Sequence, residues 1–166
     1  MALLNDCKYG ISVHGSELRL SLIKSGTHPD ARGDEGRHLF TYCLLPHACG
    51  FSVPAVVRPA YELNVPVTVC AAGEQAADVP GLLSLDSDNV IVESVKWAED
   101  GAGLIVRLYE AGKTGGKVGL TFGVPVAAVF ETNMLEEDPR ELELRESSVE
   151  LMMRAFEIKT LLCRIP

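Results

Sequence analysis

The sequence predicts an all-β chain made of short strands joined by tight turns. Apolar and polar residues alternate in several short segments, and this period of two is typical of strands that bury one face. Pairs of turn-forming residues separate such segments, for example Gly15-Ser16 and Asp100-Gly101. Helical spacing of apolar residues occurs only around residues 54–63, so one short helix is expected there.

The first part of the chain, residues 1–78, is expected to hold a few strands, too few to close a sandwich alone. A hairpin is predicted around Gly15-Ser16, and a polar, glycine-containing loop covers residues 26–36. In order along the chain, the strand patterns cover residues 9–14, 18–22, 37–45 and 65–71.

The predicted helix has a recognisable start and an interruption. Ser52 can cap its first turn, where Pro54 is tolerated because the amide of that position makes no helical hydrogen bond. Pro59 removes a hydrogen bond further on, so the helix is expected to be short and kinked.

The second part, residues 82–166, is predicted to form a small β-sandwich. Residues 73–80 are mostly small and polar and mark the expected boundary before it. A type I′ turn at Asp100-Gly101 would place Trp97 opposite Leu104, so Trp97 is predicted to lie in the core. Strand patterns without an intervening helix cover residues 82–85, 90–97, 104–110, 118–122, 126–132, 148–153 and 157–165.

Composition excludes several classes of protein. The formal net charge of −8 argues against nucleic-acid partners, which require basic residues to neutralise phosphates. The longest nearly apolar run, residues 120–130, is too short for a membrane span and contains Gly123 and Pro125. No secretory signal is visible at the start. The acidic residues 136–138 are expected to form a solvated loop.

The cysteines indicate a reducing compartment. There are five of them, an odd number at irregular spacings with no Cys-x-x-Cys pair. Thiols used as small apolar side chains fit this pattern. A cytoplasmic location is therefore predicted.

The group with the most functional character is Asn5, Asp6, Lys8 and Tyr9. Asn and Asp exchange hydrogen bonds at a turn, and Lys8 could hold a carboxylate or a sugar hydroxyl. The alternative is purely structural: an Asx-type turn, with Lys8 paired to Asp6 or to another acid.

Other candidate motifs have simpler explanations. His28, Asp30, Asp34, Glu35 and His38 could supply metal ligands, but they lie in a glycine-rich loop without diagnostic spacing, so an exposed polar loop is expected. Cys43, His47 and Cys49 lack a clear fourth ligand. Gly112-Lys113-Thr114 ends like a phosphate-binding loop, but Arg107 stands where that motif needs glycine. No catalytic constellation is visible.

Three segments together resemble a known family: residues 3–10 (LLNDCKYG), 98–111 (AEDGAGLIVRLYEA) and 156–161 (FEIKTL). Their order and spacing resemble the C-terminal part of family 38 glycoside hydrolases, the zinc-dependent α-mannosidases. The resemblance implies that residues 1–78 are the closing strands of a large, supersandwich-like β-sandwich. Residues 82–166 would be a small, terminal Ig-like sandwich. Supporting stretches lie at residues 18–22, 28–30, 38–42, 46–47, 58–62 and 129–133.

The resemblance also implies a function for the chain as a piece of an enzyme. The family's zinc ligands and aspartate nucleophile lie in an N-terminal catalytic domain, so this chain is expected to be inactive alone and to bind no metal. It would support that catalytic domain, and Asn5, Asp6, Lys8 and Tyr9 would border the cleft for mannose-containing glycans. Exposed strand edges predict self-association. The alternatives are a stand-alone carbohydrate-binding module, which an aromatic content of 6% disfavours, and an oligomerisation module.

Overall fold

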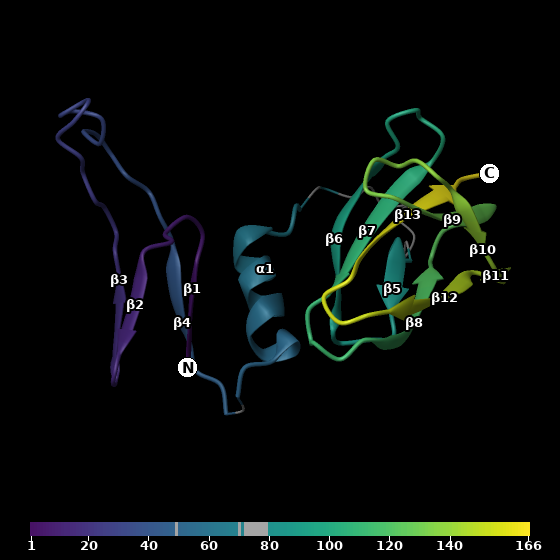
Figure 1. The fold of residues 1–166 in the computed structure, drawn as a ribbon, viewed down its shortest axis with the longest axis horizontal. Coiled ribbons are helices and arrows are strands. Elements are labelled where there is room, and N and C mark those ends of the chain that lie inside the picture. Colours follow the sequence, from purple (N-terminus) through teal and green to yellow (C-terminus); the bar gives the residue numbers. More distant parts are fainter. Residues whose placement is uncertain (49, 70, 72–79) are drawn as a thin grey trace. The chain divides into compact units, whose positions relative to one another are not determined.

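The computed structural model describes residues 1–48, 50–69, 71 and 80–166. The chain divides into two compact units, residues 1–69 and residues 70–166 (Figure 1). Strands outnumber helices in the chain, and the prediction of an all-β chain with one short helix is confirmed. The predicted boundary at residues 73–80 lies mostly outside the described residues. The assignment of the two parts to two family domains stays a prediction.

The first unit contains two small antiparallel sheets. Strand β1 (Ala2–Asn5) pairs with β4 (Tyr42–Leu45). Strands β2 (Ile11–His14) and β3 (Glu17–Leu20) form the predicted hairpin. Gly15 has φ +59° at its turn, a conformation that glycine adopts without strain.

The helical segment follows the predicted signals closely. A single turn of π-helix, η1 (Val53–Val57), leads directly into α1 (Arg58–Asn64). The Ser52 hydroxyl accepts a hydrogen bond from the Ala55 amide at 3.2 Å, as an N-cap does. Pro59 lies in the first turn of α1, where no helical hydrogen bond is lost. The change from π-helix to α-helix falls between Val57 and Arg58, just before Pro59.

Two strand predictions in this unit are wrong. Residues 65–69 and 71 form no strand, and Val67 and Val69 are almost fully exposed. Their valines alternate as in a strand, but a strand also needs a neighbour to bind its peptide groups. For the same reason the predicted strand at residues 37–45 is reduced to β4.

The second unit is a β-sandwich of two antiparallel sheets. One sheet has five strands in the order β10-β9-β13-β7-β6, and the other has four in the order β11-β12-β8-β5. The strands are β5 (Leu83–Leu85), β6 (Val90–Trp97), β7 (Leu104–Glu110), β8 (Gly116–Phe122), β9 (Ala128–Thr132), β10 (Arg140–Leu142), β11 (Leu144–Arg145), β12 (Ser148–Met153) and β13 (Ile158–Arg164).

The core lies between these two sheets. Leu108 and Leu161 from the larger sheet meet Leu120 and Leu151 from the smaller one, and all four are buried. The larger sheet also buries Ile105 on its outer face, together with Leu162 and Ala98, and the partly buried Phe130 packs against them. The outer face of this sheet is therefore covered as well, and the cover is described below.

Every strand predicted in this unit is present, but two short strands were not predicted. These are β10 and β11, which have three and two residues. Their sequence is rich in Glu and Arg and carries no alternation long enough to detect.

The prediction that Trp97 lies in the core is wrong, since 64% of its surface is exposed. Its register is as predicted, with Trp97 opposite Leu104. The facing strand β5 has only three residues, however, and β6 is at the edge of its sheet. The turn also differs from type I′: it runs from Ala98 to Gly103, and among its described residues only glycines have positive φ.

Candidate functional site

The predicted site residues lie on the turn that follows β1. The Asn5 side chain accepts a hydrogen bond from the Lys8 amide at 2.6 Å, which closes an Asx-type turn. The Asn5 carbonyl accepts from the Asn64 side chain at 3.2 Å, so the turn is tied to the end of α1. Asn5 therefore has the structural role that the second interpretation of this group expected.

Asp6 holds the same turn to the neighbouring chain segment. Its amide donates to the Thr41 carbonyl at 3.2 Å, and its carboxylate accepts from the Thr41 amide at 2.9 Å. The hydrogen bond from the Thr41 amide to the carboxylate, together with one from the Cys7 thiol, lowers the pKa of Asp6. The hydrogen bond to Asp6 in turn raises the pKa of the Cys7 thiol.

The side chains of Lys8 and Tyr9 take no part in these hydrogen bonds. The Lys8 ammonium lies 4.8 Å from the centre of the Phe40 ring, a cation–π contact in place of the expected pair with an acid. Tyr9 is 89% exposed, although it follows a rigid turn and precedes Gly10, whose carbonyl accepts from the Ser21 amide. Tyr9 is thus the member of the group with its side chain free to meet another molecule.

The five polar residues of the loop at 28–38 make local contacts. Asp30 accepts from the Arg32 amide, Glu35 binds the Arg32 side chain, and His38 Nε2 lies 2.9 Å from the Asp34 carbonyl. In the described part of the chain, no three His, Cys, Asp or Glu residues are grouped so that they could hold a metal ion. Cys49 lies outside the described residues.

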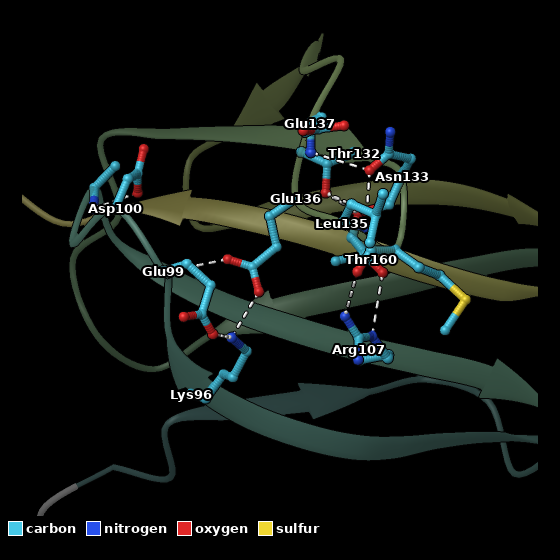
Figure 2. Close-up of polar contacts among 12 residues, drawn as sticks. Lys96, Glu99, Asp100, Arg107, Thr132, Asn133, Leu135, Glu136, Glu137 and Thr160 are labelled. Carbon is cyan, nitrogen blue, oxygen red and sulfur yellow. Dashed lines mark hydrogen bonds and ion pairs between the residues drawn. The ribbon is translucent and has the colours of Figure 1, made fainter.

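A polar network that the sequence did not reveal covers the outer face of the larger sheet (Figure 2). Lys96 Nζ, on β6, lies 2.7 Å from Glu136 Oε1 and 2.6 Å from Glu99 Oε1. Glu136 Oε2 accepts from the Glu99 amide at 2.9 Å. The hydrogen bond from Lys96, reinforced by that amide, lowers the pKa of Glu136. The acidic loop was predicted to be solvated, but the Glu136 side chain is only 11% exposed.

The rest of the loop at 133–138 is held by its own first residue and by Arg107. Asn133 Oδ1 accepts from the amides of Leu135 and Glu137 at 2.8 and 3.0 Å. Arg107, on β7, donates to the Met134 carbonyl and to the Thr160 hydroxyl (Figure 2). The loop therefore lies across the sheet face that carries Ile105, which explains why that face is buried.

Glu110 is a second carboxylate that sequence analysis missed. It ends β7, is almost completely buried, and accepts hydrogen bonds from the amides of Gly112, Lys113, Thr114 and Phe156. Burial raises the pKa of Glu110, but these backbone donors outweigh it and leave the pKa below its ordinary value. Its role is to join two turns at one end of the sandwich. In the sequence, only the turn-forming residues that follow Glu110 could have indicated this role.

Sequence comparison identifies the class of protein to which this chain belongs. The sequence model described as "Glycosyl hydrolases family 38 C-terminal beta sandwich domain" matches residues 89–161, and "Glycosyl hydrolases family 38 C-terminal domain" matches residues 1–32. The chain therefore belongs to the C-terminal region of glycosyl hydrolase family 38, as the resemblance predicted.

Individual relatives are α-mannosidases. "Alpha-mannosidase 2C1" of Homo sapiens is 40% identical over 168 residues, which cover 98% of this chain and 16% of that protein. "Alpha-mannosidase G" of Dictyostelium discoideum is 34% identical over 96% of this chain and 15% of its own length. "Alpha-mannosidase" of Saccharomyces cerevisiae is 32% identical over 67% of this chain and 12% of its own length. The chain thus spans about a sixth of the curated relatives it matches.

Proposed function

We propose that this chain is the non-catalytic C-terminal β region of a larger α-mannosidase, where it supports the catalytic domain and borders the sugar-binding cleft. The observation that carries the proposal is the extent of the match. Identity to human "Alpha-mannosidase 2C1" runs through 98% of this chain but covers only 16% of the relative. The remaining length of such a relative is ample for a separate catalytic domain.

The parent enzyme would hydrolyse α-mannosidic bonds in mannose-containing glycans. Zinc and the carboxylate nucleophile are assigned to the catalytic domain of the same polypeptide, as the resemblance to the family implies. Three free thiols, Cys7, Cys43 and Cys163, fit the proposed cytoplasmic location. No helix among the described residues is long and apolar enough to cross a membrane.

Observations on the first unit favour a scaffold role. Its two sheets have two strands each, and isolated two-stranded sheets are marginally stable in water. Val13 and Leu18 are cross-strand partners and both are exposed, as is Leu44 on β4. Apolar side chains on open strands favour a neighbouring sheet. That neighbour is proposed to be the rest of the polypeptide, and without it the chain is expected to self-associate.

The turn at Asn5–Tyr9 is proposed as the cleft edge. Asn5 and Asp6 fix the backbone through four hydrogen bonds, two to Thr41, one to Lys8 and one to Asn64. Such a rigid turn can present an aromatic ring at low entropic cost. Tyr9 would then contact sugar, and Lys8 would add a positive charge beside it.

Two measurements test the proposal. The isolated chain should not hydrolyse a chromogenic α-mannoside, and turnover that survives repurification would contradict the non-catalytic role. In the longer polypeptide with its catalytic domain, Tyr9→Ala should lower kcat/KM several-fold without changing thermal stability. Tyr42→Ala is the matched control, since Tyr42 is also exposed but lies on β4. Equal effects of both substitutions would remove Tyr9 from the cleft.

A further inference from the structure

Two large apolar side chains, those of Met134 and Leu135, are held in water by the loop at 133–138. Met134 is 58% exposed and Leu135 is 76% exposed. Single apolar side chains are ordinary on protein surfaces and need no explanation. These two differ, because they are neighbours in the sequence and the backbone that carries them is fixed.

Hydrogen bonds fix that backbone on both sides of the pair. The Leu135 amide donates to Asn133 Oδ1 at 2.8 Å, and the Arg107 guanidinium donates to the Met134 carbonyl at 3.1 Å. The side chain of Glu136, the next residue, is bound to β6, as Figure 2 shows. A group that is already held in place loses little conformational freedom when a partner binds it.

The adjoining part of the sheet adds two more apolar side chains, those of Tyr109 and Ile158. Tyr109 lies two positions from Arg107 on β7, so both side chains are on the outer face of the larger sheet. Ile158 is the cross-strand partner of Tyr109 and is exposed, whereas Tyr109 is half-buried. Because Arg107 also binds the loop, the two pairs belong to one surface. Met134, Leu135, Tyr109 and Ile158 are called the outer patch below.

The size of the outer patch indicates what kind of partner it fits. A stable interface between separate chains takes about 20–30 residues on each side, many more than this patch offers. A partner in the same polypeptide needs a smaller surface, because the covalent link keeps its effective concentration high. Relatives have ample chain for such a partner, since this chain spans only 16% of human "Alpha-mannosidase 2C1".

We propose that the outer patch docks the second unit onto the part of a longer polypeptide that precedes residue 1, with Met134 and Leu135 in an apolar hollow of that partner. Methionine and tyrosine are enriched at the centres of protein interfaces, and polar residues form the rim. The exposed residues Asn133 and Glu137 flank the pair and supply such a rim. The inference rests on the proposed function, because it requires the longer polypeptide, and it names a contact surface on the second unit.

The test compares hydrogen exchange in the 166-residue chain and in the longer polypeptide with its catalytic domain. Peptide mass spectrometry measures the exchange of residues 133–138. The loop should exchange several-fold more slowly in the longer polypeptide, because docking covers it. Met134→Gln should cancel most of this added protection, roughly tenfold, since burial of one methionine side chain is lost. In the 166-residue chain the same substitution should leave the melting temperature within about 2 °C of wild type.

Met152→Gln is the matched control. Met152 is 59% exposed, almost the same as Met134, but it lies on β12 in the smaller sheet. Met152→Gln should therefore leave the added protection of the loop unchanged.

Three outcomes would overturn the proposal. One is equal exchange of the loop in the 166-residue chain and in the longer polypeptide. Another is an equal loss of protection from Met134→Gln and Met152→Gln. The last is protection that appears in the 166-residue chain as its concentration rises, which would identify a second copy as the partner. In each case the longer polypeptide can still hydrolyse an α-mannoside, so this inference can fail while the proposed function stands.

Discussion

Lys96 Nζ and Glu136 Oε1 lie 2.7 Å apart, and this ion pair attaches the loop at 133–138 to the edge strand β6. Glu136 has φ +68°, a backbone conformation that is unfavourable for a residue with a side chain. The ion pair and the hydrogen bond from the Glu99 amide offset that cost. The loop in turn crosses the sheet face that buries Ile105.

Glu136→Gln is expected to lower the melting temperature by several degrees and to speed hydrogen exchange at the Leu135 and Glu137 amides. Because the pKa of Glu136 is lowered, its contribution is present above the ordinary glutamate pKa and disappears as pH falls through the folded value. Glu99→Gln is the control, since the Glu99 side chain is largely exposed and an exposed pair contributes little. Equal effects of both substitutions would contradict a specific role for Glu136.

Glu110→Gln should destabilise the chain by about 2–4 kcal/mol, because a buried amide group cannot accept all the backbone hydrogen bonds that the carboxylate accepts. The pKa of Glu110 is lowered in the folded state. The ionised carboxylate therefore stabilises the wild type above the ordinary glutamate pKa, and this contribution disappears as the pH falls through the folded pKa. The difference in unfolding free energy between wild type and variant should therefore shrink as pH falls. Chemical denaturation at several pH values measures this, with the exposed Glu141→Gln as control.

Trp97→Ala should cost less than about 1 kcal/mol, since most of the ring is already in water. Leu108→Ala, in the centre of the core, should cost about 2–5 kcal/mol. Trp97 is the single tryptophan, so its fluorescence reports on this site alone. Efficient quenching by acrylamide in the folded protein is expected. A blue-shifted, protected emission would show that the ring is covered.

Cys7 should react slowly with iodoacetamide for an exposed thiol, because the hydrogen bond to Asp6 raises the pKa of its thiol. Asp6→Asn should accelerate this alkylation several-fold near neutral pH, while Asp30→Asn, in the polar loop of the same unit, should not. Cys163 should stay unmodified until the protein unfolds, because burial raises the pKa of its thiol to about 12. Peptide mass spectrometry resolves the individual cysteines. An unchanged rate in Asp6→Asn would disprove the coupling.

Strand prediction succeeded where the pattern is local and long enough. The segments that became β6, β7 and β12 were predicted with the observed bounds, since each is a mostly apolar run of at least six residues. It failed at residues 65–69 and 71, where valines alternate but no strand of the described chain lies beside them. It also missed β10 and β11, which exist only because β9 and β12 bind their peptide groups.

Among the functional-site residues, too, those with a local sequence signal were predicted and those without one were missed. The turn at Asn5 and Asp6 was found because Asn and Asp in a turn carry a local signal, and the structure confirms an Asx-type hydrogen bond. Glu110 and Glu136 were missed, because nothing local distinguishes a buried carboxylate from a solvated one. Their environments come from Phe156 and Lys96, which are distant in sequence.

The sequence by itself determined that the chain is all-β, which segments alternate, and to which family it belongs. These properties depend on residues a few positions apart or on the order of short motifs. Only the tertiary structure decided that Trp97 is exposed, that the Glu136 side chain is largely shielded from solvent, and that Lys159 and Arg140 line the same pocket. Alternation determines the face of a strand on which a side chain lies, but coverage of that face depends on the length and position of other strands.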